Sequence, residues 1–489
     1  MWENLLLSLP KRPDILAIQM GAGFILLVLL AGIMFVVPPM HVAVSVAAIL
    51  TSLYFFTRPM LALFSVFTVR GVLDLLWWIP GTIGGLNMLQ LFSAAVFVLI
   101  TTQLFLDLKR MQHHECFQWF LGFLLLMVIA TLRSSDIAGN LDSVVRYLSP
   151  FILFFMVSIY FDKRRLRYAL LLTISMVGII PLSLSLYHLM TGQADTMSLH
   201  GYNRLLGGYK NLHNMALMTL IFLTLWVFWL VQIQSMFKSL LLLVLLGGGG
   251  LALYKTYIRT GFLGLTVFIA TALLFHRRYR TLAAAGAMSL LILFLSPDLQ
   301  DRFSDLMLVF DTDSIMLDKR KLGSGRWGIW TISMNKYMEQ PVWDFFLGIG
   351  LGGQRLMTLD WVKRFGAMHI TLDPHNDFLL LLFQIGPFGV LCYLAIQWKV
   401  YKAARAIHAM EHADRFARNL ATFATALTAM VFVTNSISNS FIHRTSPGWF
   451  YWCVCGLMFA EYADLKKQAA VAPGQMRAVP APVPIPAEP

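Results

Sequence analysis

Two arginine-bearing polar segments stand where long apolar stretches of the sequence end. The first, residues 202–214, holds Arg204 and Lys210 around a pair of glycines, and the second, residues 255–261, holds Arg259. The planar arginine fork matches the oxygens of a phosphate. Both segments therefore indicate phosphate binding, although the same cations also fit anchors at a membrane interface.

A third segment, residues 373–377, places His375 between two aspartates. Histidine changes its protonation near neutral pH and can serve as a general base. Asp373 or Asp377 would orient the ring, and Asn376 lies directly beside it. The alternative interpretation is a loop histidine that only makes hydrogen bonds.

Other charged residues occur near or inside apolar stretches. Arg70 and Asp74 lie four residues apart, which favours mutual neutralisation on one helix face over a functional role. Arg146 would extend a phosphate site. His443 and Arg444, in the last polar turn, fit site residues and interface anchors equally well.

Most of the remaining chain is apolar. Of the 489 residues, 58% are hydrophobic and 13% are charged, whereas a soluble domain carries about 25% charge. A helix needs about 20 residues to cross the hydrocarbon core, so we expect about fourteen spans. They are residues 15–37, 41–56, 60–78, 83–106, 115–131, 144–161, 167–190, 211–234, 237–255, 260–275, 281–296, 376–399, 418–442 and 447–462.

These spans predict an all-α, polytopic transmembrane bundle of about 12–14 helices, with one large, partly helical periplasmic loop. The expected units are N-terminal helices (1–190), helices with arginine-bearing periplasmic loops (191–296), the large loop (297–375), C-terminal helices (376–462) and a disordered Pro/Ala-rich cytoplasmic tail (463–489).

The net charge of +13 is explained by topology. With both termini in the cytoplasm, most Lys and Arg residues fall in inner loops, which is the positive-inside pattern of a bacterial inner-membrane protein. No nucleic-acid partner is therefore expected. None of the four cysteines lies in a predicted outer loop, so neither a disulfide nor a metal cluster is expected.

The large loop carries signals of folded structure. Ser324 is a candidate N-cap for an amphipathic helix over residues 327–337, and Pro341 would end that helix. Glycines at 348–353 predict a turn before a second aromatic-basic segment, residues 361–364. We interpret the loop as a folded lid over the outer membrane face; the alternative is a passive cap.

The segment that begins at His375 resembles a known motif. His375-Asn376, nine residues, Gly386, two residues and Gly389 are similar to the His-Asn/Ser/Gln-x9-Gly-x2-Gly/Thr/Tyr motif of the O-antigen ligase and Wzy-type polymerase superfamily. The superfamily's other elements occur in the same order: an Arg-x3-Gly element (Arg204, Gly208), an Arg-Thr-Gly turn (Arg259–Gly261), and Ser324-Gly-Arg326 with Trp330.

The resemblance implies a metal-independent, inverting glycosyltransferase of the C type that uses no cofactor. Its donor would be a glycan on undecaprenyl diphosphate, with Arg204 and Arg259 holding the diphosphate and His375 activating the acceptor hydroxyl. Further candidate helpers are Arg326, Lys210, Asn376 and Asp373.

Two activities of the superfamily share this chemistry. The expected number of spans favours a polymerase of exopolysaccharide or O-antigen repeat units, and the alternative is a ligase that transfers the glycan to lipid A-core. A transporter of the lipid-linked glycan or a scaffold of an export complex would not require His375. Expected partners are membrane lipids and the chain-length regulator and flippase of the same pathway.

Overall fold

Long α-helices dominate the computed structural model, which describes residues 57–76, 82–83, 86–192, 196–199, 202–297, 300, 326–365 and 373–475. The helices are α4 (Pro59–Leu73), the 3-10 turn η1 (Asp74–Leu76), α5 (Met88–Leu106), α6 (Leu108–Gln112), α7 (Phe117–Leu132), α8 (Ile137–Tyr160), α9 (Arg164–Val177), α10 (Ile179–Thr191), α11 (Leu212–Gln232), α12 (Met236–Thr256), α13 (Arg259–Phe275), α14 (Tyr279–Leu295), α17 (Arg326–Met338), α18 (Val342–Leu347), α19 (Gln354–Phe365), α20 (Asp377–Ala409), α21 (Arg415–Ile437) and α22 (Thr445–Gln475). The strands form two antiparallel hairpins, β1 (Thr82–Ile83) with β2 (Leu86–Asn87) and β3 (Thr196–Leu199) with β4 (Tyr202–Leu205).

The predicted all-α transmembrane bundle is confirmed. Among the described residues, 8 helical segments are long and apolar enough to cross a membrane, and α7 and α13 are shorter apolar helices. The first two predicted spans, 15–37 and 41–56, lie outside the described residues.

Several predicted boundaries differ from the structure, and three of the differences have a clear local cause. Helix α8 begins at Ile137 rather than 144, because the Asp136 carboxylate caps it by accepting a 2.8 Å hydrogen bond from the Gly139 N–H. The predicted span 167–190 is two helices, α9 and α10, joined at Gly178. The tail prediction is wrong for residues 463–475, which continue α22 because alanine, leucine, lysine and glutamine favour a helix.

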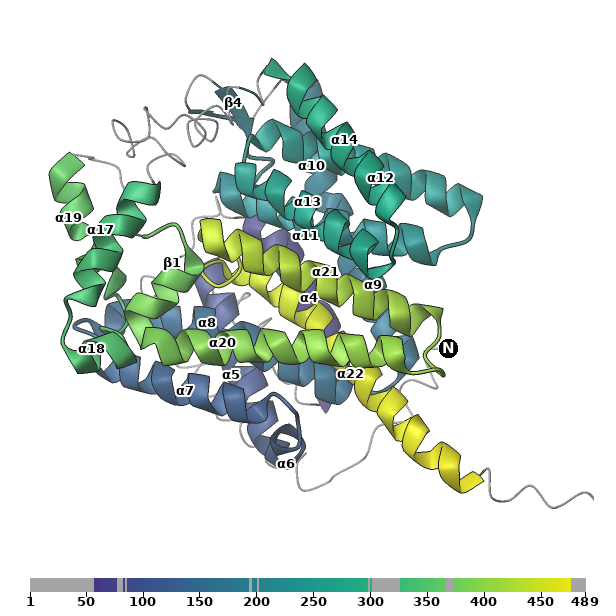
Figure 1. Ribbon diagram of the computed structural model, residues 1–489, viewed down its shortest axis with the longest axis horizontal. Coiled ribbons are helices and arrows are strands. Elements are labelled where there is room, and N and C mark those ends of the chain that lie inside the picture. The colour runs from purple at the N-terminus through teal and green to yellow at the C-terminus, as the bar shows by residue number, and fades with distance from the viewer. Residues whose placement is uncertain are drawn as a thin grey trace, which may run out of the picture.

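Helices α8, α20 and α22 build the centre of the bundle (Figure 1). Every residue from Tyr147 to Val157 of α8 is buried, as expected for a helix that is apolar all round. Trp452 of α22 packs against the rings of Phe151 and Phe154 at centroid distances of 4.6 and 5.5 Å. This aromatic core holds the helices that carry most of the site.

Helix α20 is kinked at Gly386, whose φ of 73° lies in the left-handed region. Pro387 follows and has no N–H, so the carbonyl of Phe383 cannot be satisfied within the helix. The N–H of Ile349 donates to that carbonyl instead, at 2.8 Å, and the N–H of Gly350 donates to the Gln384 carbonyl at 3.1 Å. The kink is therefore the docking point of the glycine-rich turn that precedes α19.

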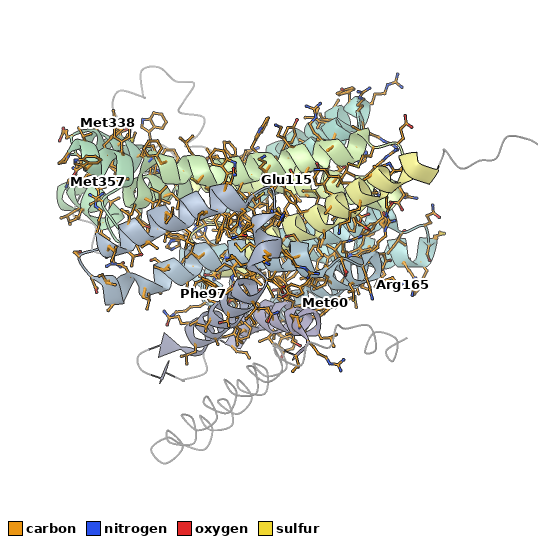
Figure 2. The ribbon with its side chains drawn as sticks, turned by 90° about the horizontal axis from the view of Figure 1, so that it is seen from below. Met60, Phe97, Glu115, Arg165, Met338 and Met357 are labelled. Atoms are coloured by element: carbon orange, nitrogen blue, oxygen red, sulfur yellow. The ribbon has the colours of Figure 1, made fainter. Side chains whose placement is uncertain are left out.

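The described part of the large loop folds onto α20. Helices α17, α18 and α19 gather beyond one end of α20 (Figure 1), and Tyr337, Met357 and Phe383 form a small core between them and α20. We call residues 326–365 the lid. Met338 and Met357 of the lid lie at the opposite end of the molecule from Arg165 (Figure 2). The predicted amphipathic helix is confirmed as α17, whereas Ser324 lies outside the described residues.

The kink generates a stability prediction. A Cβ on residue 386 would lie 2.1 Å from the carbonyl oxygen of Phe346, and a left-handed φ costs a non-glycine residue about 1–2 kcal/mol. Gly386→Ala is therefore expected to lower the apparent unfolding temperature in detergent by several degrees. Gly250→Ala is the control, because a Cβ there meets nothing within 4 Å. Equal unfolding temperatures for Gly386→Ala and the wild type would contradict this account of the kink.

Candidate active site at the lid end of the bundle

Several helix ends meet beneath the lid. A Cβ on Gly264 of α13 would lie 2.7 Å from the Leu220 side chain of α11 and 3.0 Å from that of Thr434 in α21. This close packing brings the first turns of α11 and α13 beside the last turn of α21. The polar residues at these ends therefore face one region, although they are distant in sequence.

His375 immediately precedes α20 and has a left-handed backbone, with φ of 49°. Such a conformation in a non-glycine residue costs about 1–3 kcal/mol and often marks a functional site. Its neighbours hold it there: the Pro374 carbonyl accepts a 2.7 Å hydrogen bond from the Trp330 indole N–H of the lid. The lid thus fixes the approach to His375.

Asn376 caps α20. Its side-chain oxygen accepts hydrogen bonds from the N–H groups of Phe378 and Leu379 at 3.0 and 3.1 Å. Its side-chain nitrogen donates to the Ser436 carbonyl in α21 at 2.6 Å. The structure therefore gives this predicted helper a positioning role, because Asn376 ties the start of α20 to the end of α21.

Asp377 holds the link between α21 and α22, residues 438–444, which we call the 438–444 turn. Its side chain is fully buried, and one carboxylate oxygen accepts hydrogen bonds from the N–H groups of Ser440 and Ile442 at 2.8 and 3.0 Å. Asn435 adds a 2.9 Å bond from the Phe441 N–H. The carboxylate predicted to orient His375 thus positions a separate turn beside it.

The 438–444 turn presents two charged or titratable side chains to the site. Arg444 donates to the Asn214 side-chain oxygen at 2.6 Å and to the Asn439 carbonyl at 3.0 Å. His443 lies 3.3 Å from a terminal nitrogen of Arg146 and 3.8 Å from the Asp373 carboxylate. In the sequence, only their position near the ends of predicted spans identified His443 and Arg444 as candidate site residues.

Arg326 and Arg204 stand on different elements near this end of the bundle. Arg326 begins α17 and donates to the Ile437 carbonyl at the end of α21. Arg204 is buried on β4, where its backbone pairs with Met197. His213, in the first turn of α11, lies within electrostatic reach of Arg204, Arg326 and His375.

Arg259 and Lys210 differ in their placement. Arg259 is the first residue of α13 and is half-buried, and it therefore lies at the lid end of the bundle. The side chain of Lys210 is exposed in the link between β4 and α11.

The electrostatic environment keeps His375 neutral at physiological pH. Burial, together with the positive charges of Arg326 and Arg444, lowers the pKa of His375 to about 4. Burial, Arg146 and Arg444 likewise hold the pKa of His443 well below its usual range. A neutral imidazole has a free lone pair, so His375 can accept a proton at pH 7.

Comparison with known families agrees with this site. Residues 240–394 match the family model described as O-antigen ligase. The match covers less than half of the chain, and we refer to the matched residues as the O-antigen ligase domain. The resemblance predicted from the His375 motif is thereby confirmed, and no curated protein matches the chain significantly.

The O-antigen ligase domain runs from α12 into α20. It includes Arg259, Arg326 and His375, whereas Arg204 and the 438–444 turn lie outside the matched residues. Since the turn touches the domain through Asp373 and Asp377, residues beyond the match complete the surroundings of His375.

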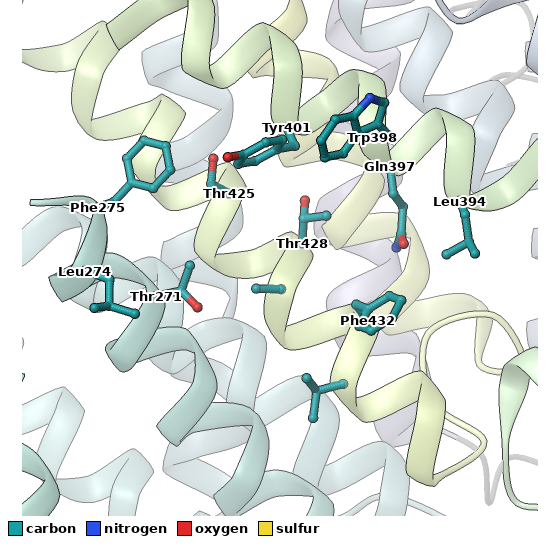
Figure 3. A pocket seen from close by; sticks show the side chains of 12 residues that line it. Thr271, Leu274, Phe275, Leu394, Gln397, Trp398, Tyr401, Thr425, Thr428 and Phe432 are labelled. Carbon is teal, nitrogen blue, oxygen red and sulfur yellow. The ribbon is translucent and has the colours of Figure 1, made fainter.

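A groove of about 680 Å³ lies between α13, α20 and α21, partly within and partly beyond the matched residues (Figure 3). Its lining is mostly apolar or aromatic, including Leu274, Leu394 and Phe432, with Thr425 and Thr428 along α21. Trp398 and Phe432 are about half exposed, as side chains facing lipid would be. The end of the groove at Val433 is one helical turn from Ile437, which accepts the bond from Arg326.

The role assigned to Asp377 predicts a large effect of its removal. Asp377→Ala leaves the N–H groups of Ser440 and Ile442 buried without an acceptor, at a cost of about 1–3 kcal/mol each. We expect a clearly lower unfolding temperature in detergent than for the wild type. Asp142→Ala is the control, because its partly exposed pair with Arg146 is worth at most about 1 kcal/mol. An equal decrease in the unfolding temperature of Asp377→Ala and Asp142→Ala would refute the anchoring role of Asp377.

Proposed function

We propose that the protein is an inner-membrane glycosyltransferase that acts at the periplasmic face on a glycan carried by undecaprenyl diphosphate. The observation that carries the proposal is a neutral histidine, His375, enclosed by arginines at one end of a transmembrane O-antigen ligase domain. A base and a set of phosphate-binding cations are the two components that this reaction requires.

In the proposed reaction, the imidazole of His375 takes the proton from an acceptor hydroxyl. The acceptor oxygen then forms a bond to the anomeric carbon as the bond from that carbon to the diphosphate oxygen breaks. Attack from the face opposite the leaving group inverts the configuration. Charge-assisted hydrogen bonds from Arg204 and Arg259 stabilise the negative charge on the departing diphosphate, so the arginines take the part that a metal ion plays elsewhere.

The groove between α13, α20 and α21 supports a lipid-linked donor. Its membrane-facing opening admits an isoprenoid chain from the bilayer, and its end at Val433 approaches the arginine-lined site. The headgroup would then lie in the site while the chain occupies the groove. Burial of each CH₂ group contributes about 0.8 kcal/mol, so even partial filling of the groove would support binding of the carrier.

We further propose that the enzyme is a polymerase that joins carrier-linked repeat units of an exopolysaccharide or O-antigen, because fourteen spans are predicted. The alternative is a ligase that moves the finished glycan to lipid A-core; the description of the matched family as O-antigen ligase favours it. The chemistry at His375 is the same in both, and the acceptor alone distinguishes them.

The glycans of cells that lack the protein test this proposal. We expect single repeat units to accumulate on the lipid carrier, since polymerisation would stop. Long carrier-linked polymer that never reaches its final acceptor would instead identify a ligase. If membranes of these cells still polymerise and transfer repeat units supplied at the outer face, while their own repeat units fail to reach that face, the protein is a transporter and the glycosyltransferase proposal is wrong.

Filling the groove tests the lipid-linked donor. Thr428→Trp places a bulky ring in the groove and is expected to raise the KM for the long-chain donor about tenfold, which corresponds to about 1.4 kcal/mol of lost binding. A donor with a short isoprenoid chain should be unaffected. Val244→Trp, on an exposed face of α12, is the control. An unchanged KM for the long-chain donor would exclude the groove as the site of the chain.

A further inference from the structure

The guanidinium of Arg444 is held in place by two uncharged groups. Its Nε donates to the Asn439 carbonyl at 3.0 Å, and Nη1 donates to the Asn214 side-chain oxygen at 2.6 Å. Arginine has five N–H donors, so three remain beyond these two bonds. Burial lowers the pKa of Arg444 to about 10, and the side chain therefore stays positively charged at neutral pH.

No carboxylate of the described residues lies within ion-pair distance of Arg444. Other arginines of the bundle do have such partners: Arg146 pairs with Asp142 at 2.7 Å, and Arg167 pairs with Glu461 at 2.8 Å. Arg444 is partly buried, and a partly buried cation without a bonded counter-ion favours an anionic ligand. The charge of Arg444 is therefore best explained by an anion that binds there during function.

The nearby carboxylates are already engaged. One oxygen of Asp377 accepts two backbone N–H groups of the 438–444 turn, and Asp373 faces His443. The other charged or titratable groups near Arg444 are Arg146, His213 and His375. Asp74 also lies within electrostatic reach of Arg444. Among the described residues, none of these groups bonds the three remaining N–H donors of Arg444, and an anionic ligand with several oxygens would satisfy them.

We propose that Arg444, positioned by Asn214 and Asn439, is a third donor-binding arginine that contacts the diphosphate of the lipid-linked donor. This inference rests on the proposed function and extends its binding site to a turn outside the O-antigen ligase match. The planar fork can bind two phosphate oxygens at once, and its position beside His375 puts the diphosphate next to the base. Asn214 and Asn439 are positioning residues, because they fix the fork.

Binding of farnesyl diphosphate and farnesol to the purified full chain tests this role. The two probes share an isoprenoid chain, so the ratio of their Kd values isolates the contribution of the diphosphate. Arg444→Gln is expected to weaken farnesyl diphosphate binding by about tenfold or more, as for loss of a charge-assisted hydrogen bond, and to leave farnesol binding unchanged. Arg444→Lys keeps the charge without the fork, and its affinity for farnesyl diphosphate should lie between those of the wild type and Arg444→Gln.

Arg418→Gln is the matched control. Like Arg444, Arg418 donates to two uncharged oxygens, the backbone carbonyls of Met410 and Glu411, but it lies at the other end of α21. Its replacement should leave both affinities at wild-type values. An unchanged ratio in Arg444→Gln would overturn the inference, and if that variant fails to fold, an unchanged ratio in Arg444→Lys would do so. A wild-type protein that binds both probes equally would instead contradict the proposed diphosphate site as a whole.

The pH dependence of glycosyl transfer tests whether the positive charge of Arg444 lies beside His375, as the proposed site requires. His375 is faced by Arg326 from the lid, by His443 and Arg444 from the 438–444 turn and by His213 from α11. Removing the positive charge of Arg444 favours protonation of His375. The acid limb of the rate profile of Arg444→Gln should therefore move to higher pH, whereas an unmoved limb would count against the inference.

Discussion

The site depends on one buried carboxylate. Asp377 lies in the first turn of α20, and its two hydrogen bonds to the N–H groups of Ser440 and Ile442 join that turn to the link between α21 and α22. A carboxylate bonded to backbone N–H groups in a low-dielectric interior contributes roughly twice as much as a neutral pair. Because His375 precedes Asp377 by two residues, the same anchor that fixes His443 and Arg444 also fixes the proposed base.

The lid is coupled to this anchor through the kink in α20. Pro387 leaves a carbonyl that the N–H of Ile349 satisfies. Trp330 of the lid binds the carbonyl of Pro374, directly before the base, and Arg326 binds the carbonyl of Ile437 at the end of α21. Gly386, the first glycine of the His375 motif, is thereby explained as the point where the lid meets the membrane helix. The glycine-rich turn thus serves as a rigid connection, although its sequence alone suggests flexibility.

The sequence predicted the features that follow from local rules. Hydropathy located twelve of the fourteen spans as helices of the structure, and the amphipathic pattern located α17. The sequence did not predict contacts between residues that are distant along the chain. Asp377 was expected to orient His375, but it binds a turn more than 60 residues away in sequence. Arg444 had no signal beyond its place at a span end, because its contact with Asn214 arises only when α11 packs beside α22.

The central claim is that His375 accepts the proton of the acceptor hydroxyl. Its most direct test is the release of undecaprenyl diphosphate from a carrier-linked repeat unit by purified protein in proteoliposomes. Replacement of His375 by glutamine keeps a polar side chain but removes the base. The account predicts that release falls by about 10²–10⁴-fold while the unfolding temperature stays near that of the wild type. Release at the wild-type rate by His375→Gln would contradict it.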